Sequence, residues 1–256
     1  MNGPALATSL PPRPPGQLAM TWLIAWRAAT EALRDRLSLL VGLFFALVLP
    51  LGVLVLVVRP MAAGADGESV VRDAIPFYLL LVGVLPAFSA VGIAAGQFAG
   101  EKERGILTPL LASPASNLAI FGGKVLGAVI PPLMYAAAAE AVYATGVAVL
   151  VGPSTVALVS VPLSVATVLL VAAVTCFAAV VASLISSRVR TFNAAQQLGG
   201  LALMPVWGVV FALAARLREL GPFALFGVVG ALVVLDAALT ALAAATWRRE
   251  EVLAQR

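Results

Sequence analysis

The 256-residue chain contains no histidine, a single cysteine and few charged residues. Without histidine it has no imidazole base and no mixed Cys/His metal site, and the lone Cys176 cannot form a disulfide within the chain. Charged residues make up 11% of the sequence and apolar residues 62%, with a mean hydropathy of +1.05. This composition lies outside the range of soluble globular proteins and predicts a polytopic protein of the lipid bilayer. The net charge of +4 does not indicate a nucleic-acid partner, because the basic residues gather at the ends of apolar runs.

Six apolar stretches are each long enough to cross a hydrocarbon core of about 30 Å as a helix rising 1.5 Å per residue. They cover residues 37–58, 74–99, 125–151, 156–186, 191–215 and 222–247. The expected fold is therefore an all-α polytopic membrane protein with a six-span transmembrane domain in residues 37–247. Several of these helices should be kinked or broken by proline. The prolines concerned are Pro50, Pro86, Pro131, Pro132, Pro162 and Pro205.

The residues before the first span divide into a tail and an amphipathic segment. Residues 1–17 are rich in proline and lack the apolar core of a signal peptide, so we expect a disordered cytosolic tail. Residues 18–36 carry Trp22 and Trp26 on one helical face and Arg27 and Glu31 on another. This pattern is typical of an elbow helix lying in the membrane interface. A soluble helix packed on another surface is the alternative.

Basic residues divide unequally between the two sides of the membrane. Twelve lie in the first segment, the second and fourth loops and the C-terminal tail (248–256), against four in the remaining segments. Because short cytosolic segments carry the excess of Lys and Arg, both termini should be cytosolic.

The densest charge in the middle of the chain lies between the second and third apolar stretches. Residues 101–104 read Glu-Lys-Glu-Arg and follow an uncharged run from 74 to 100. Ile106, Leu107, Leu110 and Leu111 then repeat at helical spacing. Ser113 reads as a helix N-cap with Pro114 at the first helical position. We therefore expect a short amphipathic helix at the membrane surface, a break and a new helix.

The sequence around Lys124 does not form a nucleotide site. A phosphate-binding loop needs Gly-x4-Gly-Lys-Ser/Thr, but Leu118 stands at the first glycine and Val125 at the hydroxyl position. Any ATP must therefore be hydrolysed on another polypeptide.

Residues 101–107, 110–114 and 123–124 resemble the loop between spans two and three of type-2 ABC export permeases. The run before the first span (33–36) and the Arg-Arg-Glu-Glu-Val-Leu of residues 248–253 match the same family. The family more often has Thr where Ile106 stands and a basic residue where Ser116 and Asn117 stand. Within the family, the amino-acid sequence of residues 107–114 and of the C-terminus looks nearest to sodium-efflux-type members.

This resemblance implies a transport subunit that is not itself an enzyme. Such permeases pair with a second copy or a related permease and dock two ATP-binding subunits, which hold ATP and Mg, so no cofactor is expected in this chain. The implied location is the prokaryotic cytoplasmic membrane, and the implied role is export. The coupling segment (100–124) would contact the ATPase, although an ordinary solvated loop is the alternative. The residues expected to couple are Glu101, Glu103, Arg104, Gly105, Leu107, Leu110, Leu111, Ser113 and Pro114.

Two carboxylates lie deep within apolar runs. Glu140 and Asp236 are each expensive in a bilayer, so each should face protein or water, with Tyr143 and Thr240 available on the same helix faces. They are candidates for the translocation path, together with Asn193 and Gln197 near the start of span five. The alternative is that the carboxylates are packing residues and that the polar residues of span five merely cap its helix.

Gly92, Gly96 and Gly100 recur every four residues, which allows close helix packing in lipid. A competing function, transport without ATP by a secondary transporter or channel, would use Glu140 and Asp236. An intramembrane enzyme is disfavoured, because no second polar cluster accompanies these carboxylates.

Overall fold

The computed structural model describes residues 16–106, 113–154 and 160–246, and within these residues it contains helices and no strand. Six helical segments are long and apolar enough to cross a membrane. In order, spans one to six are Arg36–Ala62, Gly67–Glu103, Asn117–Leu150, Val161–Arg188, Phe192–Ala215 and Glu219–Thr246. The expected all-α polytopic fold with six spans is thereby confirmed.

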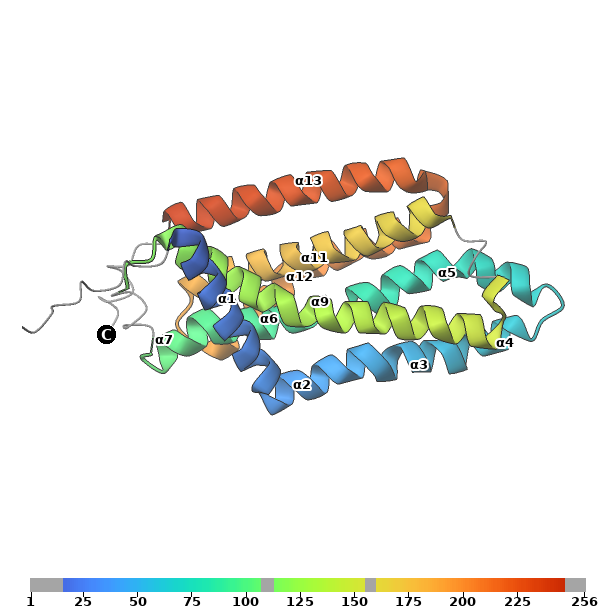
Figure 1. The fold of residues 1–256 in the computed structure, drawn as a ribbon, viewed down its shortest axis with the longest axis horizontal. Coiled ribbons are helices and arrows are strands. Elements are labelled where there is room, and N and C mark those ends of the chain that lie inside the picture. Colours follow the sequence, from blue (N-terminus) through green and yellow to red (C-terminus); the bar gives the residue numbers. More distant parts are fainter. Residues whose placement is uncertain (1–15, 107–112, 155–159, 247–256) are drawn as a thin grey trace, which may run out of the picture.

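The six spans run side by side along the long axis of the molecule (Figure 1). Helix α1 (Gln17–Arg34) instead crosses the bundle near one end, which we call the α1 end. The last described turn of α13 (Leu217–Thr246) lies at the same end. The described chain therefore starts and finishes on one side of the bundle, as an even number of spans requires.

Spans one and two are built from several short helical pieces. Pro50 lies in the first turn of one piece of span one, between two stretches of π-helix, whose wider turns accommodate a missing backbone N–H. Span two breaks at Leu85 and Pro86, as predicted from the proline. The pieces of span one are α2 (Arg36–Leu43), η1 (Phe44–Val48), α3 (Leu49–Val53), η2 (Leu54–Val58) and α4 (Arg59–Ala62). Those of span two are α5 (Gly67–Val84), α6 (Ala87–Ala95), η3 (Gly96–Gly100) and α7 (Glu101–Glu103).

Spans three to five are single helices that tolerate their prolines. Pro131, Pro132 and Pro205 lie inside continuous helices, whereas Pro162 lies in the first turn of its helix, where its missing N–H costs least. The three helices are α9 (Asn117–Leu150), α11 (Val161–Arg188) and α12 (Phe192–Ala215).

Helix α11 lies at the centre of the bundle. It packs against α5, α6, α9, α12 and α13. Buried apolar side chains such as Leu80, Phe98 and Leu170 form the main core around it. By contrast, span one and α13 lie on opposite edges (Figure 1) and leave large apolar side chains exposed, among them Leu56 and Val234. These faces are suited to lipid or to another membrane helix.

Helix α1 lies close against the first half of α9. A Cβ at Gly123 would lie 2.8 Å from the carbonyl oxygen of Thr21, and one at Gly127 would lie 3.0 Å from that of Ala25. Both glycines are therefore needed for the approach of the two backbones. Trp22 and Trp26 remain exposed on the other side of α1. The amphipathic helix expected from the sequence thus exists, with its small residues toward α9 and its tryptophans outward.

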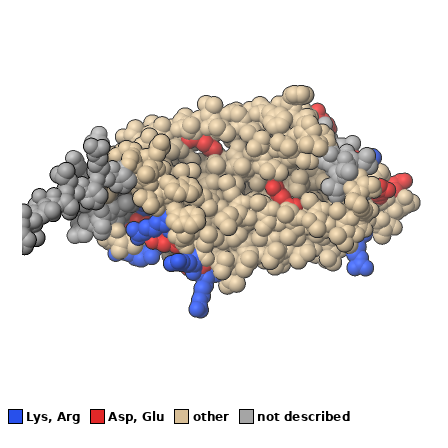
Figure 2. All heavy atoms as spheres, viewed as in Figure 1, with Lys and Arg blue, Asp and Glu red and all other residues tan. Residues whose placement is uncertain are grey.

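Charged side chains gather at the two ends of the molecule (Figure 2). On the face shown, the middle carries no charged side chains except for two isolated acidic patches. Glu140 and Asp236 are 9% and 8% exposed and lie in spans three and six.

Candidate functional site

Span two ends in a charged turn, residues 101–104, at the α1 end of the bundle. Gly105 stops the helix with a φ of +71°, a left-handed conformation that glycine adopts without strain. The Gly105 N–H donates to the Lys102 carbonyl and the Ile106 N–H donates to the Glu101 carbonyl, both at 3.1 Å. This is the Schellman pattern that satisfies the last carbonyls of a helix. Gly105, expected to take part in coupling, therefore defines where the charged turn ends.

The charged side chains of this turn bind three other spans. Glu101 pairs with Lys124 of α9 at 2.6 Å. Lys102 donates to the carbonyls of Ser187 and Val189 at the end of α11, at 3.1 and 3.3 Å. Because cationic side chains stabilise the C-terminal end of a helix, Lys102 also caps the C-terminus of span four.

The remaining two charges of the turn bind backbone groups, Glu103 in span five and Arg104 within span two. The carboxylate of Glu103 accepts the backbone N–H of Phe192 at the first turn of α12, at 3.0 Å. An acidic group is favourable there, since the N-terminus of a helix carries partial positive charge. Arg104 donates to the carbonyl of Gly100 within its own span, at 3.1 Å. The turn is thus a junction between spans two, three, four and five.

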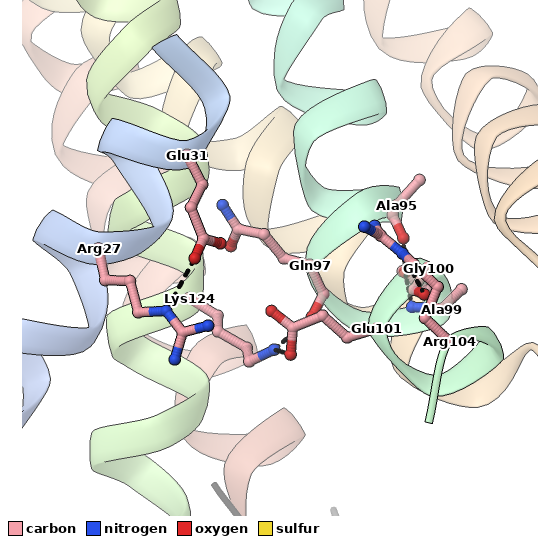
Figure 3. Close-up of polar contacts among 10 residues, drawn as sticks. Arg27, Glu31, Ala95, Gln97, Ala99, Gly100, Glu101, Arg104 and Lys124 are labelled. Carbon is pink, nitrogen blue, oxygen red and sulfur yellow. Dashed lines mark hydrogen bonds and ion pairs between the residues drawn. The ribbon is translucent and has the colours of Figure 1, made fainter. Parts of the chain in front are cut away.

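Lys124 is the most buried charge of this junction. Its side chain is 2% exposed, and its ammonium donates to the carboxylate of Glu101 and to the backbone carbonyl of Gln97 (Figure 3). The ammonium also lies 5.0 Å from the centre of the Phe98 ring, within the range of a cation–π interaction. The sequence placed Lys124 in a loop before span three, but α9 begins at Asn117 and encloses it.

A buried serine supports the π-helix just before the charged turn. The hydroxyl of Ser186 in α11 accepts the N–H of Ala99 at 3.0 Å and donates to the carbonyl of Ala95 at 3.3 Å. These backbone groups belong to the stretch where η3 departs from α-helical hydrogen bonding. Sequence reasoning missed Ser186, because a serine in an apolar run carries no signal of its partner in another span.

The start of span three differs from the prediction. Ser116, not Ser113, caps α9: its hydroxyl accepts the N–H of Ala119 at 3.1 Å. Ser113 and Pro114 precede the helix, and Gln17 of α1 donates to the Pro114 carbonyl at 3.4 Å while its own carbonyl accepts the Ser116 N–H at 2.8 Å. Leu107, Leu110 and Leu111, with the amphipathic helix predicted around them, lie outside the described residues.

Helix α1 contributes an ion pair beside the junction. Arg27 and Glu31 are 2.8 Å apart one helical turn from each other, and both are exposed. The hydrogen bond and charge of Glu31 raise the pKa of Arg27. Figure 3 shows this pair on α1 facing the Lys124–Glu101 pair and the side chain of Gln97.

A cavity of about 830 Å³ adjoins the junction. It lies between α1, span one, the half of span two nearer the α1 end, and the start of α12. Gly92, Gly96 and Gly100 line it. A Cβ at Gly92 or Gly96 would meet only the side chains of Gln196 and Phe192, at 3.6 and 4.0 Å. Within the described chain this glycine ladder therefore widens a cavity instead of bringing two backbones together.

The polar candidates of the translocation path do not converge. Among the residues lining this cavity, α12 contributes Gln196, and neither Asn193 nor Gln197 is included. The cap of α12 is Thr191, whose hydroxyl accepts the N–H of Ala194 at 3.3 Å. Asn193 and Gln197 are exposed.

The two intramembrane carboxylates occupy separate places. Glu140 of α9 fills the space left by Gly83 of α5, where a Cβ would collide with its carboxylate. Within the described chain, one carboxylate oxygen of Glu140, the hydroxyl of Tyr143 and both carboxylate oxygens of Asp236 are buried without a hydrogen-bond partner. The described residues hold no group of three or more Cys, Asp or Glu side chains suited to a metal ion.

A family model described as ABC-2 type transporter matches residues 20–211, from the first turn of α1 into the last turns of α12. No curated protein matches the chain. The matched stretch contains the whole junction around residues 101–104 and both walls of the adjoining cavity.

Proposed function

The chain belongs to the ABC-2 type transporter family, and on that premise we propose that it is the permease subunit of an ATP-driven exporter. The family and the six apolar helices make it a multi-pass membrane component of a transporter. ATP would be hydrolysed by a separate ATP-binding subunit. The permease would move its substrate by alternating access.

The observation that supports this proposal most directly is the junction at the end of span two. Glu101, Lys102 and Glu103, three successive residues, bind spans three, four and five. A displacement applied to this turn therefore acts on three further spans at once. Separating Glu101 from Lys124 would leave a buried charge unpaired, which is strongly unfavourable. The turn is suited to transmit a movement rather than absorb it.

The side of the membrane follows from charge. The twelve-to-four division of basic residues favours a cytosolic location for the α1 end. ATP is available on that side. Residues 107–114, which continue from the charged turn, would then contact the ATPase, and Leu110 and Leu111 would contribute about 1.5–3 kcal/mol per side chain if fully enclosed.

The proposed assembly contains two permeases and two ATP-binding subunits. The second permease would be another copy of this chain or a relative, held through the exposed apolar faces of the outer spans. The proposed location is the cytoplasmic membrane of a prokaryote. ATP and Mg would be bound by the ATPase. The similarity to sodium-efflux-type members remains a prediction.

Co-purification tests the proposal. The tagged permease, extracted from its native membrane with mild detergent, should recover a polypeptide that hydrolyses ATP. Leu110→Ser combined with Leu111→Ser should abolish this recovery while the permease stays in the membrane. The matched control is Val149→Ser with Leu150→Ser, two exposed apolar residues at the far end of α9. Equal ATPase recovery by both double variants would remove residues 107–114 from the interface.

The buried carboxylates favour a second candidate function, transport without ATP. Glu140 and Asp236 have carboxylate oxygens with no partner among the described residues, and such groups in a membrane often bind a proton or cation. This candidate predicts substrate uptake into proteoliposomes of the permease alone, and loss of that uptake in Glu140→Gln or Asp236→Asn. Uptake that requires the ATPase and nucleotide would exclude it.

A further inference from the structure

The cavity beside the junction has the size of a small-molecule site. Its volume of about 830 Å³ lies within the range of pockets that hold drug-sized ligands, roughly 300–1,000 Å³. A bare metal cation needs far less space. The lining residues extend along span two from Phe88 to Glu101, which is roughly 20 Å of helix. The cavity is therefore elongated along the axis of span two.

The part of the cavity deeper in the bundle is apolar. Val41 and Phe45 of span one and Phe88 and Ile93 of span two line this part. The ring of Phe88 is held by stacking on Trp207, with 4.0 Å between ring centres and 18° between planes. A fixed aromatic wall of this kind is suited to an alkyl or aryl group.

The part near the charged turn is acidic. Four carboxylates line the cavity, against one guanidinium, Arg104. Arg27 and Lys124 partly neutralise Glu31 and Glu101 from outside the lining. Asp35 and Glu103 accept backbone N–H groups and form no ion pair with the described residues. Among the residues that line the cavity, carboxylates therefore outnumber cationic side chains by four to one.

Gln97 is a buried polar side chain that the fold itself does not use. It is 7% exposed, it lines the cavity, and neither the oxygen nor the nitrogen of its side-chain amide has a hydrogen-bond partner among the described residues. Figure 3 shows its amide directed toward Glu31 across the gap between span two and α1. Burying an amide without a partner costs free energy, and in native proteins such a group calls for a specific reason.

We propose that this cavity binds an amphiphilic organic cation that carries an N–H group, such as a primary alkyl- or arylammonium. Its apolar part lies along Phe45 and Phe88, and its ammonium lies between Gln97 and Glu31. The ammonium donates to the side-chain carbonyl of Gln97 and to the carboxylate of Glu31 that also holds Arg27. The inference rests on the proposed function in taking this ligand as the exported substrate.

Three probes with one alkyl chain separate charge from hydrogen bonding. Dodecylammonium is a cation with N–H donors, dodecyltrimethylammonium is a cation without them, and dodecanoate is an anion. Binding is measured by equilibrium dialysis of the full chain in nanodiscs of zwitterionic lipid, with lipid-only nanodiscs subtracted and no nucleotide present. Dodecylammonium should bind saturably and at least about tenfold more tightly than dodecanoate, because the acidic end disfavours an anion.

Two variants and one control test the residues. Gln97→Leu should weaken dodecylammonium about tenfold, the loss of one hydrogen bond to a charged group, and leave dodecyltrimethylammonium unchanged. Without ligand, the Gln97→Leu protein should unfold at the same temperature as the unsubstituted protein or at a higher one, since the substitution removes an unpartnered amide. Glu31→Gln should weaken both cations. Glu68→Gln, an exposed carboxylate in the first turn of span two at the opposite end, should change neither.

Several results would overturn the site. They are equal binding of cation and anion, no saturable binding of dodecylammonium, or unchanged affinity in Gln97→Leu or Glu31→Gln. Because the assay contains neither ATPase nor nucleotide, its result is separate from the proposed function. Cation binding without a recoverable ATPase would support the proposed binding site and contradict the proposed exporter function. Recovery of the ATPase without cation binding would support the exporter function and contradict the binding site.

Discussion

The carboxylate of Glu101 lies 2.6 Å from the ammonium of Lys124, and the lysine side chain is almost wholly buried. One partner ends span two and the other lies in the second turn of span three. The loop that joins these spans is therefore anchored internally on both sides. Lys124 also donates to the backbone carbonyl of Gln97, one turn before Glu101. The end of span two is thus held to span three by two contacts of one side chain.

We expect Glu101→Leu to destabilise the permease by about 3 kcal/mol, because it leaves Lys124 as an uncompensated buried charge. Combining it with Lys124→Met should recover most of the lost stability, since well-packed apolar groups often replace a buried pair without cost. Thermal unfolding of the four proteins of this double-mutant cycle measures the coupling. If the two single effects simply add, the pair is not an internal contact.

A second prediction concerns the π-helix of span two. Ser186→Ala should destabilise the protein by about 1–3 kcal/mol, because the N–H of Ala99 loses its acceptor in a buried place. Ser183 lies one turn earlier on α11, is buried and has a hydroxyl without a partner among the described residues. Ser183→Ala should therefore be neutral or stabilising. Unfolding in denaturant compares the two, and equal effects would exclude the bridging role of Ser186.

The spans were predictable from sequence because bilayer thickness fixes the length of an apolar helix. The break at Pro86 followed from the backbone restrictions of proline. The partners of Lys102, Glu103 and Lys124 did not, because they lie on helices far away in the chain. Local charge pattern marks the end of a span, but it does not reveal which neighbour each charge binds.

The same limit explains why the cavity could not be predicted from the sequence. In the sequence, Gln97 is one polar residue at the end of an apolar run. It becomes part of a buried cavity lining only because α1 and span one approach span two. The glycine ladder at Gly92, Gly96 and Gly100 was read as a packing face by its spacing. Spacing identifies the face, but it does not tell whether another helix or a cavity lies against it.

A third prediction is the topology. In a background of Cys176→Ala, Gly64→Cys should react with a membrane-impermeant thiol reagent from outside intact cells, and Leu118→Cys should react only after permeabilisation. Gly64 lies in the turn between spans one and two, and Leu118 is 57% exposed in the first turn of α9. Ser116 is avoided because its hydroxyl caps α9. The reverse labelling pattern would place the α1 end outside.

The last prediction separates the shape of the charged turn from the stability of the fold. Gly105 adopts a φ of +71° with open space around its missing Cβ, so Gly105→Ala adds backbone strain and no collision. The expected cost is about 1–2 kcal/mol, localised where the turn leads into residues 107–112. Gly122 also has open space but lies inside α9, so Gly122→Ala should be neutral or stabilise by about 0.4–1 kcal/mol.

Stability and ATPase activity are then read side by side in the purified complex. Gly105→Ala should lose most of the substrate-stimulated ATPase activity while the assembly is still recovered, because the direction of the chain leaving the junction has changed. Gly122→Ala should keep both. Full stimulation in Gly105→Ala would mean that the contact with the ATPase does not depend on how span two ends, and the junction would then be a structural anchor alone.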